Sequence, residues 1–363
     1  MMQEQDLREL AEVVSEKAYI LSLYLNLDRR SRSFEEHKLS LRSLLAQAAE
    51  QGAAAADIER IERFFEHEFD RQGRTLVCFS CQAQKFWRGY SLLVPCQNVV
   101  FVGRRPYLKP LSDIWDNYGR FGVLMVDREG ARAFVYHLGA LVDTEGVLGG
   151  EVRRHKQGGW AAQKLQRYED LEARHNLKAA AEWAEGHLAQ HKVDRVVLAG
   201  SEDNLAAFRE QMSRVLHDRV VGQINLDMNT SPAEAWDHAF EVAQNAQRQA
   251  EADLLEHVIT LAHKGGAGAI GLADTLAATQ EGRLYQLLVS PTMHVAGYQC
   301  DNCEAVLIEA VDKCPYCSGA LTSSADVVNL VVHRAIDDAV RVSVLERDAR
   351  LTEVGGIAAL LRY

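Results

Sequence analysis

Four cysteines are the residues whose spacing most clearly predicts chemistry. They form two CxxC pairs, Cys300–Cys303 and Cys314–Cys317, separated by ten residues. Each pair can present two thiolates on one turn, and two such turns complete the tetrahedral S₄ shell that suits Zn²⁺. The short spacer still has room for a β-hairpin between the pairs. The spacing predicts a closed, structural zinc site; the alternative is a reduced thiol cluster without metal.

A basic segment around two glycines is the second candidate. Gly158 and Gly159 precede Trp160, and seven Lys and Arg residues fall between positions 153 and 178. Adjacent glycines permit close backbone approaches, the basic flank attracts phosphates, Trp160 can stack on a base, and the Gln163 amide can orient a water molecule. A solvated helix face beside an ordinary Gly-Gly turn explains these residues equally well. The candidate RNA-binding residues are Arg153, Arg154, His155, Lys156, Trp160, Lys164, Arg167 and Arg174.

Three other motif-like stretches predict no catalytic chemistry. Cys78 and Cys81 fall in a predicted strand, where residues i and i+3 face opposite sides, so core thiols are favoured. The GxGxxG match at 266–271 follows a predicted helix instead of a strand, which favours a flexible turn over a nucleotide site. His67-Glu68 begins HExxH, but Arg71 replaces the second histidine and excludes a zinc protease of that type.

The hydrophobic pattern predicts an α/β fold of three domains, 1–115, 116–264 and 265–363. The role of the N-terminal domain stays open. Its helices are expected over 5–18 and 34–70, and its strands over 19–27, 75–80, 89–94 and 98–102. Pro106 and Pro110 are interpreted as its exit linker.

The second domain must position the glycine pair. Its first expected elements are strands over 121–126 and 131–138, an irregular stretch over 139–159, and a helix over 160–191. Leu165, Tyr168 and Leu171 recur every three residues, which indicates this helix. The later expected elements are a strand over 193–200, a helix over 202–216, a strand over 219–226 and a helix over 231–263.

The third domain must hold the cysteines. A cysteine-bearing insert is expected over 298–320. The elements around it are helices over 274–280 and 325–339, and strands over 284–290 and 340–345.

Composition and charge exclude several classes of protein. The chain has 363 residues, 47% of them hydrophobic and 25% charged, which is typical of a globular protein and excludes a disordered chain. A formal net charge of -11 argues against a DNA-coating protein but allows a local basic patch. The N-terminus lacks a signal-peptide pattern, and no apolar stretch reaches the length of about 18 residues that a membrane span needs. We therefore expect a cytoplasmic protein that binds neither membranes nor DNA.

Several stretches together resemble one family. HKQGGWAAQKLQRYEDLEARHNLKAAAEWA, residues 155–184, resembles the GGQ loop and long helix of archaeal and eukaryotic class-one release factors. YGRFGVLMVDREGARAFVYHLG at 118–139, GLADTLAATQEGRLYQLLVS at 271–290, and the terminal GGIAALLRY are similar to other parts of that family. The paired CxxC resembles the zinc-bearing minidomain of archaeal members. The resemblance covers about residues 118–363 and indicates a bacterial-type branch, related to peptidyl-tRNA hydrolases of ribosome quality control, Pelota and Balon-type factors.

The sequence departs from the family pattern in two places. The family glutamine after Gly-Gly is Trp160 here, so Gln163, three positions later, is the candidate replacement. Residues 1–112 contain no NIKS-type codon-reading motif, so the resemblance does not extend to stop-codon recognition.

The resemblance implies a three-domain factor that enters the ribosomal A site and contacts rRNA and peptidyl-tRNA. Its second domain would be a mixed sheet with long helices carrying the Gly-Gly loop. Gly158 and Gly159 would shape the catalytic loop, and Gln163 would position the water. The third domain would be an α/β/α sandwich with a Cys₄ zinc insert that docks a translational GTPase.

Three functions follow from this resemblance. The first is codon-independent hydrolysis of the peptidyl-tRNA ester in the rescue of stalled ribosomes. The alternative is a non-catalytic A-site binding factor for ribosome hibernation or protection, which the replacement of the glutamine by Trp160 favours. A surveillance factor of the Pelota type is a third hypothesis, against which the glycine loop argues.

Overall fold

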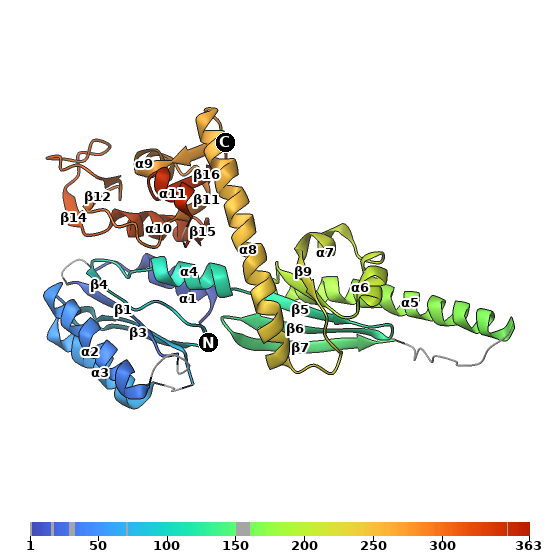
Figure 1. The fold of residues 1–363 in the computed structure, drawn as a ribbon. Helices are drawn as coiled ribbons and strands as arrows, with labels where there is room; N and C mark the ends of the chain where they lie inside the picture. Colours follow the sequence, from blue (N-terminus) through green and yellow to red (C-terminus); the bar gives the residue numbers. More distant parts are fainter. Residues whose placement is uncertain (1, 16–17, 29–32, 70–71, 150–159, 347) are drawn as a thin grey trace. The chain divides into compact units, whose positions relative to one another are not determined.

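The computed structural model of this chain describes residues 2–15, 18–28, 33–69, 72–149, 160–346 and 348–363, and for 160–166 it describes the backbone alone. The fold is mixed α/β with several sheets (Figure 1). It divides into two compact units. Unit 1 combines Met1–Asp116 with Ala250–Tyr363, and unit 2 is Asn117–Gln249. A further division of unit 1 into an N-terminal and a C-terminal domain stays a prediction.

The N-terminal part of unit 1 contains a four-stranded antiparallel sheet. Its strands follow the order β3-β2-β1-β4, and they are β1 (Ile20–Asn26), β2 (Thr75–Cys81), β3 (Phe86–Leu92) and β4 (Val99–Gly103). The helices of this part are α1 (Glu4–Glu12), α2 (Phe34–Glu50), α3 (Ala55–Arg63), a π-helical turn at Phe64–Glu68, a 3₁₀ turn at Gln82–Gln84, and α4 (Lys109–Tyr118). Helices α2 and α3 lie beside this sheet (Figure 1), and Leu41, Leu44 and Ile61 of these helices pack with Leu23 and Leu76 of the strands. This packing buries one face of the sheet and explains the apolar spacing in 34–70.

The C-terminal part of unit 1 contains a second four-stranded sheet in the order β10-β16-β11-β15. Its strands are β10 (Gly268–Ile270), β11 (Leu284–Val289), β15 (Arg341–Val344) and β16 (Ile357–Leu361). The β11–β15 pair is parallel and the other two pairs are antiparallel. Its helices are α9 (Gly271–Gln280), α10 (Val327–Asp337) and α11 (Ala349–Glu353). The last turns of the long helix α8 (Pro232–His263) cover this sheet, with Leu255 and Val258 packed near Leu288 and Ala358.

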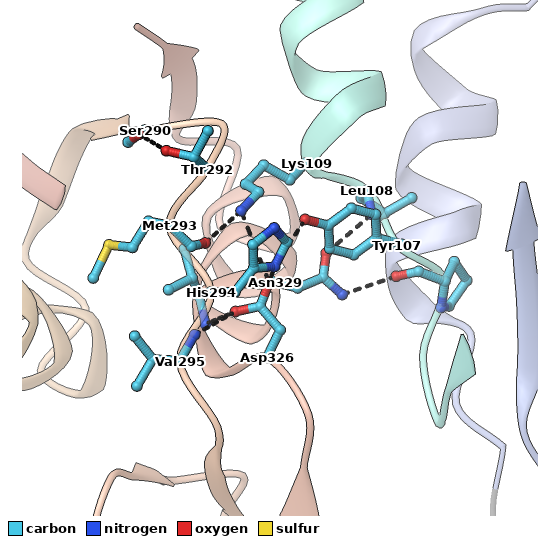
Figure 2. Close-up of polar contacts among 12 residues, drawn as sticks. Tyr107, Leu108, Lys109, Ser290, Thr292, Met293, His294, Val295, Asp326 and Asn329 are labelled. Atoms are coloured by element: carbon cyan, nitrogen blue, oxygen red, sulfur yellow. Dashed lines mark hydrogen bonds and ion pairs between the residues drawn. The ribbon is translucent and has the colours of Figure 1, made fainter. Parts of the chain in front are cut away.

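A buried polar cluster joins the two parts of unit 1, as Figure 2 shows. Lys109 and Asp326 are almost inaccessible, and the Lys109 Nζ atom donates to the Met293 carbonyl at 2.5 Å and lies 3.8 Å from Asp326 Oδ2. His294 Nδ1 lies 3.0 Å from the same oxygen and 3.5 Å from the Tyr107 hydroxyl. Burial lowers the pKa of Lys109, and the negative charge of Asp326 opposes that shift.

The same cluster overturns one expectation from the sequence. The segment around Pro106 and Pro110 is not a linker, because Leu108 is fully buried and its N–H donates to Asn329 Oδ1 at 3.0 Å. The Asn329 amide in turn donates to the Pro106 carbonyl at 3.0 Å. The prolines correctly predicted a segment without regular secondary structure. This segment is buried within unit 1, where its backbone groups make tertiary hydrogen bonds.

Unit 2 is built on one mixed five-stranded sheet in the order β7-β6-β5-β8-β9. Its strands are β5 (Phe121–Val126), β6 (Gly130–His137), β7 (Ala140–Leu148), β8 (Val196–Ala199) and β9 (Val220–Ile224). The β5–β8 and β8–β9 pairs are parallel, and the β5–β6 and β6–β7 pairs are antiparallel. The helices α5 (Trp160–Gln190), α6 (Glu202–Arg209) and α7 (Arg214–Arg219) pack on one face of this sheet. The first turns of α8 pack on the other face through Ala235, Ala239 and Ala243.

A second expectation is wrong: residues 139–148 were expected to be irregular, but most of them form strand β7. The strand pairs with β6 along almost its whole length. It is the edge strand of the sheet and most of its residues are exposed, so it carries no apolar alternation for a sequence pattern to detect.

Candidate functional site

The predicted glycine loop lies between β7 and α5. Gly158 and Gly159, together with Arg153, Arg154, His155 and Lys156, lie outside the described residues. Trp160, Gln163 and Lys164 belong to the first turns of α5, but their side chains also lie outside the described part. The structure therefore locates the start of the helix that follows the glycines and leaves the catalytic assignment a prediction.

The first described side chains of α5 are exposed. We call residues 167–172 the stalk, because five of its six side chains are exposed and Glu169 is half-buried. Tyr168 and Leu171, whose spacing indicated a helix, are each 64% exposed. Among the described side chains of α5, Ala173 is the first buried one, and from there the helix packs on the sheet through Leu177, Ala180, Ala181, Ala184 and Leu188. The helix is therefore anchored along its C-terminal half, while the stalk beside the glycine segment does not contribute to the core.

The two described candidate RNA-binding residues share a face of this helix. Arg167 and Arg174 are exposed, and their separation of seven residues is close to two helical turns. Opposite charge lies nearby, since Arg128 Nη2 contacts Asp170 Oδ1 at 2.8 Å and Lys178 Nζ lies 3.9 Å from Glu182 Oε1. These exposed pairs contribute little stability, on the order of 0–1 kcal/mol each. The exposed face can therefore rearrange around an anionic partner at small cost.

The four predicted metal ligands come together at one end of unit 1. Cys300 Sγ lies 3.4 Å from Cys317 Sγ, and Cys303 Sγ lies 3.6 Å from Cys314 Sγ. All four sulfur atoms lie within 4.8 Å of one another. For a zinc–sulfur bond of about 2.3 Å, the edge of a regular tetrahedron is about 3.8 Å. The sulfur positions therefore fit a tetrahedral ion of this size.

The backbone around the cysteines consists of two matching turns. The N–H of Glu304 donates to the Cys300 carbonyl at 3.0 Å, and the N–H of Ser318 donates to the Cys314 carbonyl at 2.9 Å. Glu304 and Ser318 both have positive φ, 58° and 59°. Gly319 completes the second turn, because a Cβ at this position would lie 3.0 Å from Cys300 Sγ. This repeated geometry brings each CxxC pair onto one turn, as the spacing predicted.

The electrostatic surroundings act in opposite directions on two of these thiols. A hydrogen bond from Asn302 and another from the Gly319 backbone lower the pKa of Cys317 to about 6. Against a hydrogen bond from the Ala305 backbone, hydrogen bonds with the neighbouring cysteines raise the pKa of Cys303 to about 12, so the thiolate that metal binding requires is favoured at Cys317 and not at Cys303.

The strands near the cysteines differ in one detail from the expectation. The insert contains β12 (Gly297–Cys300), β13 (Val306–Leu307) and β14 (Leu321–Ser324) in the order β13-β12-β14. The first CxxC pair is therefore at the turn of the β12–β13 hairpin, and no complete hairpin lies between the two pairs.

The weaker motifs behave as core elements. Cys78 and Cys81 lie in β2 and are fully buried, and burial raises the pKa of Cys78 far above its usual value. The GxGxxG stretch is not a flexible turn, because it contains β10 and the start of α9. A Cβ on Gly268 would lie 2.5 Å from the Val258 carbonyl oxygen, so this glycine serves close packing against α8.

A second group of metal-type ligands was not anticipated from the sequence. Asp143 of β7 lies beside His187 of α5 and His191 directly after that helix, with one ligand atom from each residue within 4.8 Å of the others. The HxxxH spacing in a predicted helix was a usable signal, because residues i and i+4 share a face. The missing part was the carboxylate, since β7 had been expected to be irregular.

Comparisons with known proteins give the following matches. Residues 106–251 match the family described as bacterial archaeo-eukaryotic release factor family 10. The peptide chain release factor subunit 1 of Methanocaldococcus jannaschii is 22% identical over 290 residues, which cover 71% of this chain and 69% of the relative.

Solved structures of similar proteins align over nearly the whole chain. An archaeal translation termination factor, aRF1, is 17% identical, covers 100% of this chain and 99% of its own, and has a TM-score of 0.29. Archaeoglobus fulgidus Pelota is 13% identical, covers 99% and 92%, and has a TM-score of 0.34. Within the described residues, no helix combines the length and apolar character needed to cross a bilayer.

Proposed function

We propose that this chain is a ribosome-associated translation factor of the archaeo-eukaryotic release factor superfamily. The family match covers the central segment that contains the glycine pair and α5. The relative from M. jannaschii is named as a peptide chain release factor subunit, a protein of translation. These sequence matches support the ribosome, with its rRNA and peptidyl-tRNA, as the partner.

The more specific proposal is codon-independent hydrolysis of the peptidyl-tRNA ester on stalled ribosomes. The observation that carries it is the exposure of the stalk. The stalk follows the first two turns of α5, and α5 begins directly after the glycine pair. A catalytic segment of this kind must reach a reaction centre formed by another molecule. An exposed stalk on an anchored helix satisfies that requirement, whereas a helix buried from its first turn would not.

The proposed chemistry needs three contributions. A water molecule must be positioned for attack on the ester carbonyl, other water must be excluded, and the developing oxyanion must be stabilised. We assign water positioning to the Gln163 amide and the close backbone approach to Gly158 and Gly159. Arg153, Arg154, His155, Lys156, Trp160, Lys164, Arg167 and Arg174 would hold RNA through phosphate contacts and base stacking.

A single-turnover release assay tests this proposal. Stalled ribosome–nascent-chain complexes are mixed with excess protein, and the rate of peptide release is measured. We expect Gln163→Ala to slow release by about 10²-fold, the usual effect of removing one pre-positioned polar group. Gln166→Ala, in the same helix, is the matched control and should release peptide at the wild-type rate. Release at the uncatalysed rate by the wild-type protein would contradict the hydrolase proposal.

A non-catalytic A-site factor for hibernation or protection is the second candidate. Trp160 directly after the glycine pair favours it, because an indole can stack on a base but cannot orient a water molecule as an amide does. In this case the protein should co-sediment with idle ribosomes, protect them, and release no peptide. Trp160→Ala should then weaken ribosome binding more than Gln163→Ala does.

We also propose that the four cysteines hold a structural Zn²⁺. The short distances between the four sulfur atoms and the two matching turns support this assignment. Zinc in a closed Cys₄ shell would tie the hairpin of β12 and β13 to the second turn, and would contribute folding energy directly. The resulting surface of the C-terminal part is the proposed docking site for a translational GTPase. Metal analysis should show that Cys303→Ser loses one zinc equivalent per chain relative to the wild type.

A further inference from the structure

We propose that unit 2 contains a second metal site, formed by Asp143 of β7, His187 of α5 and His191 directly after that helix, which binds a divalent transition-metal ion of the zinc type. We call these three residues the His–Asp cluster. The proposal is independent of the activity proposed above, because it rests only on side chains of β7 and of the C-terminal end of α5 with the turn that follows it. It also differs from the cysteine site, which lies in unit 1.

The distances in the cluster match those of a coordination shell. His187 Nε2 lies 3.2 Å from Asp143 Oδ2, and His191 Nε2 lies 3.7 Å from the same oxygen. Zinc bonds to imidazole nitrogen and carboxylate oxygen are about 2.0–2.1 Å long, which gives a tetrahedral edge of about 3.4 Å. The two measured separations lie on either side of this value, so a single ion can contact all three atoms after small adjustments.

The facing atoms lack other partners in the described part of the chain. His187 Nε2 and Asp143 Oδ2 are both buried, and neither makes a hydrogen bond of acceptable geometry there, although they lie close together. His187 is only 4% exposed, so solvent does not compensate its nitrogen. A buried polar atom without a partner costs about 1–3 kcal/mol. A metal ion between these atoms would satisfy both at once.

A second carboxylate is placed to orient the first histidine. Glu145 Oε2 lies 3.3 Å from His187 Nδ1, the ring nitrogen that faces away from the cluster. When the Nδ1–H group of His187 donates a hydrogen bond to Glu145, the proton stays on Nδ1 and the lone pair of Nε2 is available to the metal. The Trp183 indole stacks on the same imidazole, with ring centroids 5.0 Å apart, and restricts its rotation. The ligand is therefore held in the orientation that metal binding requires.

The charge and the donor types identify the class of ion. Asp143 and Glu145 supply two negative charges, while the guanidinium of Arg120 is engaged with the His191 carbonyl, Nη1 to oxygen, at 2.6 Å. Two imidazole nitrogens and one carboxylate suit Zn²⁺ and its transition-metal neighbours, whereas Mg²⁺ and Ca²⁺ prefer oxygen ligands alone. Asp143 and His191 are 29% and 22% exposed, so water can reach a fourth coordination position.

Metal at this site would connect β7 to α5. These two elements flank the segment 150–159 in the sequence, and β7 is an edge strand with few buried residues of its own. An ion that joins Asp143 to the histidines would therefore stabilise the pairing of this strand beside the C-terminal end of α5. The sulfur ligands of unit 1 could not provide this connection.

A zinc titration against a chelating dye tests the proposal on the full-length protein. We expect the wild type to bind two zinc equivalents, one in the cysteine cluster and one in the His–Asp cluster. His191→Gln and Asp143→Asn should each lose one equivalent, while Cys303→Ser should lose the other. Both replaced ligands are partly exposed, and circular dichroism would verify that the variants fold. His175→Gln, an exposed histidine of the same helix, is the matched control and should keep both equivalents.

Two further measurements separate a built site from incidental binding. Glu145→Gln should retain the second equivalent but weaken its affinity by about 10–100-fold, the usual effect of removing an orienting partner. Co²⁺ bound to the variant in which all four cysteines of the cluster are replaced by serine should give visible d–d absorption without a thiolate charge-transfer band, and adding His191→Gln to that variant should abolish the absorption. A wild-type protein that binds only the equivalent lost in Cys303→Ser would overturn the proposal. Unchanged binding in both His191→Gln and Asp143→Asn would overturn it as well.

Discussion

Charged residues inside unit 1 show how single side chains depend on their partners. Lys109 and Asp326 are 2% and 1% exposed, and Asp326 also caps α10 by accepting the Val328 N–H at 3.0 Å. Nothing in the local sequence indicated this pair, because its members are more than 200 positions apart. The sequence around Lys109 showed two prolines and suggested a linker, whereas burial of the lysine depends on tertiary packing.

The first residue-scale prediction concerns this ion pair. Asp326→Asn keeps the shape of the side chain but leaves the buried Lys109 ammonium without a counter-charge, and should destabilise the protein by about 3–5 kcal/mol. The double variant Lys109→Met/Asp326→Asn should be more stable than Asp326→Asn alone, since no buried charge remains. Urea unfolding of the two single variants and the double variant measures the coupling. Strictly additive changes in the free energy of unfolding would show that the two charges do not interact.

A second residue-scale prediction concerns pH. The ring of His333 is buried, with Nδ1 3.0 Å from the Ala11 carbonyl oxygen and Nε2 2.7 Å from the Pro106 carbonyl oxygen. Burial lowers the pKa of His333 to about 4. The unfolded chain, with a histidine pKa near 6.5, binds the proton first as pH falls. Stability from the neutral ring is therefore complete above about pH 6.5 and decreases toward pH 4, by about 3 kcal/mol in total.

The pH effect is best measured as a difference between two proteins. Partial burial raises the pKa of the neighbouring Asp337 to about 6, and this carboxyl group acts in the opposite direction over the same range. Subtracting the stability of His333→Gln from that of the wild type isolates the histidine. We expect the difference to grow between pH 4 and 6.5. A flat difference would contradict the depressed pKa of His333.

At the scale of helices and strands, apolar periodicity located most elements, and the exceptions have physical causes. Residues 34–50 and 173–188 bury the faces that their spacing indicated. Strand β7 was missed because an exposed edge strand needs no apolar residues. Tyr168 and Leu171 have helical spacing, but their side chains are exposed. The pattern therefore predicted the helix but did not predict that this part of it is exposed to solvent.

Two glycines give a paired prediction at this scale. Gly268→Ala should destabilise the packing of β10 on α8 by about 1–3 kcal/mol, because the new methyl group would press on the Val258 carbonyl and the Ala262 N–H. Gly186→Ala in α5 should stabilise by about 0.5–1 kcal/mol, since nothing lies within 4 Å of the added carbon and alanine favours the helix. Thermal unfolding of both variants measures the two changes. Equal effects would show that backbone proximity at Gly268 does not matter.

At the scale of the whole molecule, the sequence predicted that the four cysteines lie together, but it did not predict that Asp143 lies beside His187 and His191. Both CxxC pairs are local motifs, so their spacing alone predicted the geometry. The His–Asp cluster combines a helix with a distant edge strand, and only the sheet register brings Asp143 to His187. The glycine loop was indicated by sequence resemblance, and the structure adds the exposed stalk that follows it.

Ribosome binding should depend on the charges of the stalk and its base. Arg167→Ala/Arg174→Ala should weaken co-sedimentation with ribosomes. The slope of log affinity against log salt should fall by about 0.7–0.9 for each phosphate that the variant no longer neutralises. Arg214→Ala, on α7 and 94% exposed, is the control and should leave the slope unchanged. An unchanged slope in the double variant would exclude Arg167 and Arg174 from RNA binding.

A density map of the protein bound to a stalled ribosome tests the central claim most directly. Both proposed functions predict that the protein occupies the A site, with Gly158 and Gly159 beside the peptidyl-tRNA ester. In the hydrolase case Gln163 should point toward that ester, and in the protective case Trp160 should stack on RNA. A bound protein whose glycine segment lies far from the peptidyl-transferase centre, or a failure to bind ribosomes at all, would contradict the account.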